Sequence, residues 1–171
     1  GVESMSRAPW AMMKPERLPT TTAPKLWDTT VGWRFNNPKM DGMYPIVSLG
    51  EGAEIIAEEM QISREEQDNY SLESHIRAIA AINDNKFNDE IIPISVPQRR
   101  GDAVVVDIDE HPRYEKKNGQ HKIAVDSKIL GNLRPAFKKN GSVTAGNSSG
   151  INDGAAALLM ASQEKSEELN L

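Results

Sequence analysis

The residues best suited to hold a ligand gather in a polar turn near the C-terminal end of the sequence, over residues 141–154. The turn has four glycines, several Ser, Thr and Asn residues, and no bulky side chain beyond Val143 and Ile151. Glycine leaves no Cβ in the way of an approaching group, and the polar side chains offer hydrogen bonds to the chain or to a ligand. We therefore predict a ligand-facing turn, followed by an apolar run over residues 155–161 that is predicted to be buried.

Other reactive groups are few. The sequence has no cysteine, which excludes disulfides and a thiolate nucleophile within this chain. Its histidines, His75, His111 and His121, lack the neighbours of a metal site, so we expect packed or surface histidines and no bound metal. The pair Arg99-Arg100 is interpreted as a solvated loop tip or as a contact for nucleotide phosphates.

Composition narrows the function classes. The 171 residues are 38% hydrophobic and 26% charged, with a formal net charge of -5. This balance argues against a nucleic-acid partner, because phosphate binding normally requires a basic surface. No apolar run approaches the roughly 18 residues that cross a membrane, and no secretory signal is present at the N-terminus. We expect a cytoplasmic globular protein.

A short helix is predicted over residues 53–60, where apolar side chains recur at helical spacing: Ala53, Ile56, Ala57 and Met60. The other face carries Glu54, Glu58 and Glu59, which we expect to be solvated.

A longer helix is predicted to begin at Ser63, where Ser63 and Glu66 have the spacing of a capping box, and to run for about 18 to 20 residues. Glu73 and Arg77 are spaced for an ion pair on its exposed side. Its buried stripe is predicted to contain Leu72, Ile76, Ile79 and Ala80.

The middle of the chain is predicted to be β-structure. Residues 91–96 and 103–107 are predicted to pair as strands around a turn, and Asn118-Gly119 is typical of a tight hairpin. Ser162 is predicted to cap a last helix.

Four ordered blocks then resemble one known family. Residues 1–9, 62–68, 133–137 and 141–157 are similar to sequence blocks of the thiolases, which make and cleave 3-ketoacyl-CoA thioesters. Residues 26–40 resemble the 3-ketoadipyl-CoA and related 3-ketoacyl-CoA thiolases most closely. The resemblance implies an α+β lid domain, with an extended N-terminal segment, over residues 1–140. It also implies that residues 141–171 form a turn, a strand and the start of a helix at the edge of a thiolase-fold (αβαβα) core.

The family's reaction uses two cysteines and a histidine beside them, none of which this chain supplies. The resemblance therefore implies that the chain is an internal segment of a longer acyltransferase, inactive by itself and without catalytic residues of its own. Coenzyme A is expected as a substrate, and no cofactor is expected.

The same resemblance assigns residues to coenzyme A. Arg113, in an Asp-Glu-x-x-Arg pattern, is expected at the adenine nucleotide, while Ala145 and Ser149 are expected along the pantetheine arm. Ser127 is expected to bond CoA or, alternatively, to cap a short helix. Leu49 is expected against the acyl or pantetheine end.

The expected partners are CoA or acyl-CoA, the rest of a thiolase polypeptide, and further subunits of a homodimer or homotetramer. The aromatic side chains of Trp27, Trp33 and Phe35 are interpreted as a subunit contact or as local core. Two alternatives remain to the enzyme: a non-catalytic module that binds CoA or acyl lipids, and a scaffold segment without a ligand.

Overall fold

The computed structural model describes residues 1–15 and 23–170, and these divide into two compact units. One unit comprises residues 1–36 and 151–171, and the other comprises residues 37–150. The second unit contains the buried core and all of the elements that build the candidate site. Part of the N-terminal segment that was predicted to be extended, residues 16–22, lies outside the described residues.

In the first unit, two short antiparallel strand pairs hold the chain together. Asp153 of one pair accepts hydrogen bonds from the backbone N–H of Ser6 at 2.9 Å and from its hydroxyl at 2.5 Å. The described elements of this unit are β1 (Val2–Ser4), a 3-10 turn (Met5–Arg7), β2 (Trp10–Met12), β3 (Leu26–Asp28), β8 (Asp153–Ala155) and α5 (Gln163–Leu169).

The apolar run at residues 155–161 was predicted to be a buried strand, and this prediction is wrong for the chain as it stands. Strand β8 ends at Ala155, and the residues after it form neither helix nor strand. Leu158 and Met160 are 93% and 91% exposed. Ser162, by contrast, caps α5 as predicted, because its side chain accepts the Lys165 N–H.

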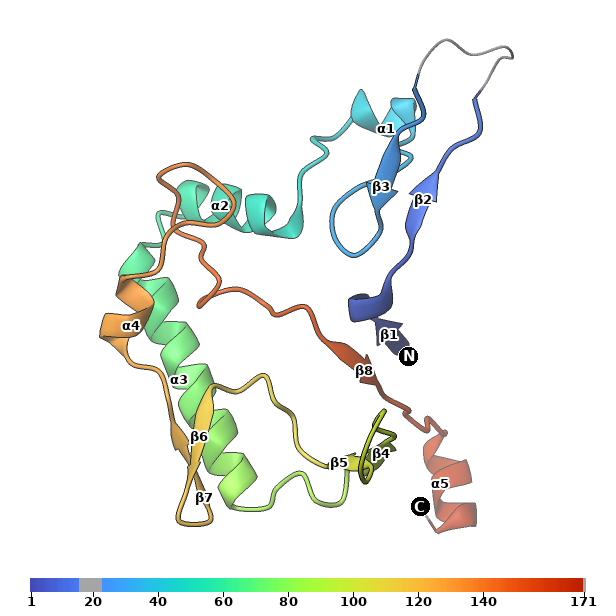
Figure 1. Cartoon of the computed structure of the whole chain (residues 1–171), viewed down its shortest axis with the longest axis vertical. Coiled ribbons are helices and arrows are strands. Elements are labelled where there is room, and N and C mark those ends of the chain that lie inside the picture. The colour runs from blue at the N-terminus through green and yellow to red at the C-terminus, as the bar shows by residue number, and fades with distance from the viewer. Residues whose placement is uncertain (16–22, 171) are drawn as a thin grey trace. The chain divides into compact units, whose positions relative to one another are not determined.

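The described residues of the second unit form four helices and two β-hairpins. Its elements are α1 (Pro38–Asp41), α2 (Leu49–Glu59), α3 (Arg64–Asn83), β4 (Ile94–Val96), β5 (Val104–Val106), β6 (Tyr114–Lys117), β7 (Gln120–Ile123) and α4 (Ser127–Gly131). Figure 1 shows the β6–β7 hairpin lying along the C-terminal half of α3, and α4 beside the N-terminal half.

Local sequence signals explain where these elements begin and turn. The predicted capping box of Ser63 and Glu66 is present at the start of α3, and Ser48 and Glu51 form a second one at the start of α2. The predicted antiparallel pairing of β4 with β5 is confirmed. At the tip of the β6–β7 hairpin, Asn118 and Gly119 have φ angles of 52° and 79°, the left-handed pair that a type I′ turn requires.

The predicted faces of both helices need correction. In α2, Glu54 is buried beside Ala57, whereas Ile56 and Met60 of the predicted apolar stripe are 54% and 70% exposed. In α3 the buried side chains are Asp68, His75 and Ile79, whereas Ile76 is exposed. In both helices a polar residue lies on the buried face because residues 141–149 pack there and supply its hydrogen-bond partners.

The core is small and lies where α3, α4 and the polar turn meet. Its apolar side chains are Ala57, Ile79, Val125, Leu130 and Val143. Thr144, which is fully buried, forms a β-bridge with Pro135. The turn that was predicted from its glycines is therefore part of the core of this unit.

Candidate functional site

The polar turn is attached to α2 by one buried carboxylate. Glu54, 4% exposed, accepts the backbone N–H of Ser142 at 2.9 Å and that of Val143 at 2.8 Å, together with the Ser142 hydroxyl at 3.1 Å. Burial alone raises the pKa of Glu54, but these hydrogen bonds outweigh it and hold that pKa below its ordinary value. The carboxylate is thus ionised and fixes the entry of the turn.

A second buried carboxylate attaches the turn to α3. Asp68 accepts a hydrogen bond from Asn147 Nδ2 at 2.9 Å and forms an ion pair with Arg64 at 2.8 Å. Asn147 in turn accepts the Thr144 N–H at 2.7 Å, so one amide side chain closes the turn and connects it to the helix. Arg64 also donates to the carbonyl of Leu130, at 2.6 Å.

The tip of the turn packs closely on the core at Gly146. A Cβ built there would lie 2.5 Å from Leu133 Cδ1 and 2.7 Å from Leu130 Cδ2. The Gly146 carbonyl accepts the Ser71 hydroxyl at 2.7 Å, and the Ser148 hydroxyl donates to the Thr144 carbonyl at 2.7 Å. The backbone from residue 142 to residue 148 is therefore held in one conformation before any ligand arrives.

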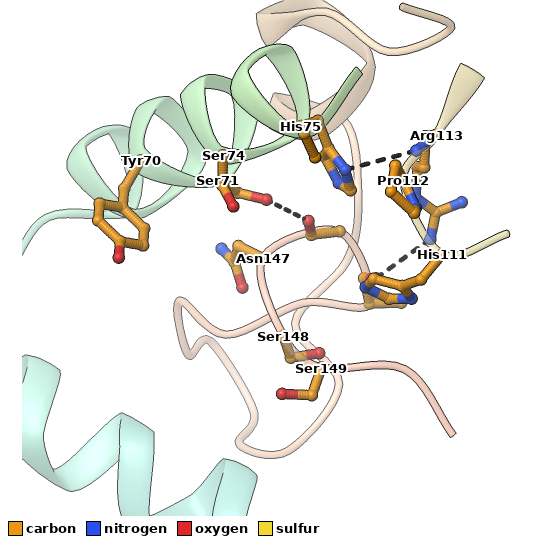
Figure 2. A pocket seen from close by; sticks show the side chains of 13 residues that line it. Tyr70, Ser71, Ser74, His75, His111, Pro112, Arg113, Asn147, Ser148 and Ser149 are labelled. Atoms are coloured by element: carbon orange, nitrogen blue, oxygen red, sulfur yellow. Dashed lines mark hydrogen bonds between the residues drawn. The ribbon is translucent and has the colours of Figure 1, made fainter. Parts of the chain in front are cut away.

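A pocket of about 290 Å³ opens beside this fixed turn, as Figure 2 shows. One wall is a face of α3 with Tyr70, Ser71, Ser74, His75 and Ala78. The remaining lining residues are His111, Pro112 and Arg113 before β6, and residues 145–149 of the turn. Most of these side chains are small or polar, and the exposed ones include Ala145 and Ser149.

Arg113 is held from both sides of the pocket. Its backbone N–H donates to His75 Nδ1 at 3.4 Å, and its guanidinium Nη2 donates to the Ala145 carbonyl at 3.4 Å, both drawn in Figure 2. The His75 ring also lies 6.1 Å from the His111 ring, centroid to centroid. The guanidinium is exposed, so its remaining N–H donors are open to a ligand.

The charge of the pocket favours an anion. Among the described residues that line it none is acidic, whereas Arg113 carries a positive charge. Burial, then the neighbouring His111 and Arg113, lower the pKa of His75. His75 is consequently neutral near pH 7, and the fixed charge of the pocket is that of Arg113.

The structure brings three of the five predicted ligand residues together. Arg113, Ala145 and Ser149 line the one pocket, and the Ser149 hydroxyl has no hydrogen-bond partner within the described part of the chain. Ser127 and Leu49 do not line it. Leu49 is 96% exposed at the first turn of α2, and the cap of α4 is Asp126, not Ser127, so the predicted capping role of Ser127 is wrong.

Sequence reasoning missed the α3 wall of the pocket. Ser71, Ser74, His75 and Ala78 follow the spacing i, i+3, i+4 and i+7, which places them on one helical face. The members of this face are small or polar, so it shows no apolar periodicity in the sequence. A stripe of small and polar residues that runs along a helix beside its buried stripe is a sequence signal that could have identified this pocket wall.

Within residues 1–15 and 23–170, no group of three or more His, Asp or Glu side chains is placed to hold a metal ion. In the same part of the chain, no helix is both long and apolar enough to cross a membrane.

Comparison with known proteins gives one consistent family. The sequence model of the thiolase N-terminal domain matches residues 1–164. A beta-ketoadipyl-CoA thiolase of Acinetobacter baylyi is 48% identical over 164 residues, which are 96% of this chain and 38% of that protein. A 3-oxoadipyl-CoA/3-oxo-5,6-dehydrosuberyl-CoA thiolase of Escherichia coli K12 is 42% identical over 164 residues, again 96% of this chain and 38% of that protein.

Solved structures agree with the sequence match. The crystal structure of the Bacillus anthracis acetyl-CoA acetyltransferase superposes with a TM-score of 0.77 at 38% identity, covering 100% of this chain and 39% of that one. Human mitochondrial 3-ketoacyl-CoA thiolase gives a TM-score of 0.76 at 34% identity, covering 99% of this chain and 39% of that one.

The chain thus spans about 40% of the length of the relatives that it matches. The matched model describes the N-terminal domain and not a lid, so the predicted lid boundary at residue 140 stays a prediction. Sequence match, identity and fold agree: the chain belongs to the thiolase family, as a segment of its N-terminal domain.

Proposed function

We propose that this chain is the CoA-binding segment of a thiolase that transfers acyl groups between CoA thioesters. The reaction is 3-ketoacyl-CoA plus CoA giving acyl-CoA plus acetyl-CoA. The observation that carries the proposal is the pocket that joins Arg113 to the turn at Ala145 and Ser149. Family membership supports it, because the relatives named above are thiolases of CoA thioesters.

Each of the three residues has a chemical task in this proposal. The guanidinium of Arg113 can stack on the adenine base or hold phosphate oxygens in its planar fork. Ala145 has only a methyl group, which leaves room for the thin pantetheine arm beside the backbone. The unengaged hydroxyl of Ser149 is available to an amide of that arm.

The acyl-transfer chemistry itself belongs, in our proposal, to parts of a longer polypeptide. Thiolate attack needs a cysteine, and this sequence has none. We therefore propose that the chain alone catalyses no thiolysis. A homodimeric or homotetrameric parent in the cytoplasm, acting on products of fatty-acid or aromatic breakdown, is part of the same proposal.

Calorimetry with CoA tests the binding part. Arg113→Gln should weaken CoA binding about tenfold or more, since hydrogen bonds to charged groups contribute about 1.5–3 kcal/mol. Arg77→Gln, on the exposed side of α3 and outside the pocket lining, is the matched control and should leave affinity unchanged. Equal affinities of the wild type and Arg113→Gln, or no CoA binding by the wild type, would overturn the proposal.

The absence of cysteine also favours a second candidate, a thiolase-like module that binds CoA or acyl lipids without catalysis. The reading frame around this chain separates the two. An upstream cysteine together with downstream Gly-His-Pro and Cys-x-Gly blocks supports the enzyme, and thiolysis by the full-length product then confirms it. A full-length product that binds CoA but cleaves no 3-ketoacyl-CoA supports the module.

A further inference from the structure

His75 is a buried side chain of the pocket to which the proposed function gives no task. It lies in the middle of α3, is 8% exposed, and points across the pocket wall toward the segment 111–113, as Figure 2 shows. Its Nδ1 lies 3.4 Å from the backbone nitrogen of Arg113. No residue of α2 or of the polar turn makes a comparable contact with that nitrogen.

The contact requires one protonation state of the ring. The backbone N–H of Arg113 is a donor, so Nδ1 has to be the acceptor, and the ring proton of neutral His75 has to lie on Nε2. The lowered pKa of His75 favours this neutral form near pH 7. A buried imidazole in this state supplies an acceptor at a fixed place on a rigid helix.

The backbone of Arg113 is thereby fixed at both of its polar groups. Its carbonyl accepts the Ala124 N–H at 2.9 Å, across the β6–β7 hairpin, and its N–H is directed to His75. Pro112 restricts the rotation of the residue before it as well as its own. The backbone of Arg113 is thus fixed, and only its side chain can still rotate. The guanidinium of that side chain donates a hydrogen bond to the Ala145 carbonyl.

We propose that His75 is a positioning residue, which sets the place of Arg113 in the pocket through the Arg113 backbone N–H. The ligand in this proposal is the CoA of the proposed function, on which it rests. The chain orients Arg113 from the helix side through His75 and from the turn side through Ala145. Without the His75 acceptor, the segment 111–113 can move, and the Arg113 guanidinium then occupies more positions. Ordering it again on binding lowers the affinity for CoA.

Two substitutions separate this task from mere packing. His75→Asn keeps an acceptor, because its Oδ1 is attached to Cγ as Nδ1 is in histidine. His75→Leu keeps the bulk of the side chain and removes the acceptor. Glu73→Gln, on the exposed side of the same helix, is the matched control. The unfolding midpoint of each variant is recorded, so that a loss of stability is told apart from a loss of binding.

Two quantities are measured on this chain: CoA affinity by calorimetry, and hydrogen exchange of the Arg113 amide without ligand. We expect His75→Leu to bind CoA about threefold to tenfold more weakly, from the usual contribution of one hydrogen bond. His75→Asn and Glu73→Gln should stay within about twofold of the wild type on the same scale. The Arg113 amide should exchange faster in His75→Leu alone.

Each outcome decides the question. Unchanged affinity in His75→Leu, or an equal loss in His75→Leu and His75→Asn, overturns the proposal and leaves His75 a packing residue. If the wild type binds no CoA, the proposed function fails, and the ligand-free exchange experiment still decides whether His75 fixes Arg113. Protection of that amide that does not depend on residue 75 overturns the positioning role in either case.

Discussion

Replacing Glu54 with glutamine tests how the polar turn is held in place. The Glu54 carboxylate accepts hydrogen bonds from the backbone N–H groups of Ser142 and Val143 and from the Ser142 hydroxyl. Glutamine has nearly the same shape, but one of its terminal atoms is a donor. In the variant, Oε1 can still accept both N–H groups, at 3.0 Å and 2.8 Å, but the amide nitrogen takes the place of Oε2, so the Ser142 hydroxyl loses its acceptor.

The expected cost follows from these contacts. A buried donor without its partner costs about 1–3 kcal/mol, and the lost charge weakens the bonds that remain, so Glu54→Gln should lower the free energy of unfolding by about 2–4 kcal/mol. Glu58 is the matched control on the same helix. Its ion pair with Lys138 has partners that are 71% and 50% exposed, so Glu58→Gln should cost no more than about 1 kcal/mol.

Urea unfolding measures both variants. Equal slopes with denaturant and a midpoint shift confined to Glu54→Gln are expected, because the change acts on stability and not on the surface exposed. A Glu54→Gln protein that unfolds within about 0.5 kcal/mol of the wild type would refute the reasoning, since that is the range of ordinary surface substitutions. The turn would then be held by packing alone.

Acid adds an independent check on Glu54. The pKa of Glu54 in the folded state is lowered from its ordinary value of 4.5. The contribution of Glu54 to the free energy of unfolding is therefore complete above pH 4.5 and is lost as the pH falls through the folded-state pKa. The wild type should lose stability over this window. Glu54→Gln, which has no proton to take up there, should show a flatter dependence.

Three further outcomes are expected. Gly146→Ala should cost about 1–3 kcal/mol in urea unfolding, because the new methyl group meets Leu133 and Leu130 and overpacks the core; a neutral result would contradict the close approach. Gly52→Ala, inside α2 with nothing within 4 Å of the new methyl group, should instead stabilise by about 0.5–1 kcal/mol. Since the pKa of His75 is lowered in the folded state, stability should fall as the pH drops below the ordinary value of 6.5 and level off below the folded value; an identical pH profile in His75→Asn would contradict this.

Local signals in the sequence predicted local structure. The capping residues of α3 and α5 and the hairpin at Asn118-Gly119 each depend on groups within a few residues of one another. For that reason the start of α3, its length of 20 residues and the β6–β7 turn follow from spacing alone. The ion pair of Glu73 with Arg77, at 2.7 Å, belongs to the same class.

The buried faces of the helices could not be predicted in this way, because their partners lie far away in the chain. The buried Glu54 accepts hydrogen bonds from backbone N–H groups that are 88 and 89 residues away in the sequence. The buried Asp68 accepts one from a side-chain amide 79 residues away. A rule that places carboxylates outside and aliphatic side chains inside assigns both residues to the wrong face. Long-range hydrogen bonding has outweighed the period of the apolar residues here.

The candidate site was predictable in its loop half and not in its helix half. Arg113, Ala145 and Ser149 lie in segments that resemble thiolase blocks, the resemblance assigned them to coenzyme A, and the structure gathers them around one pocket. His75 was interpreted as a packed or surface histidine, and its burial shows that it is packed. His75 also accepts the backbone N–H of Arg113, which is 38 residues away in the sequence. The spacing of residues along the sequence does not predict a contact over that separation.

The apolar run after β8 is exposed to solvent. Leu158, Leu159 and Met160 are 93%, 81% and 91% exposed, although full burial of such side chains contributes about 1.5–3 kcal/mol each. An apolar run of this kind marks a surface that another surface covers. The described residues do not cover it, whereas Val143 and Asn147 of the preceding turn are hydrogen-bonded to α2 and α3. The turn that lines the pocket is therefore packed within the described chain, whereas the apolar run that follows is not. This difference supports the proposal that further thiolase polypeptide packs against the run.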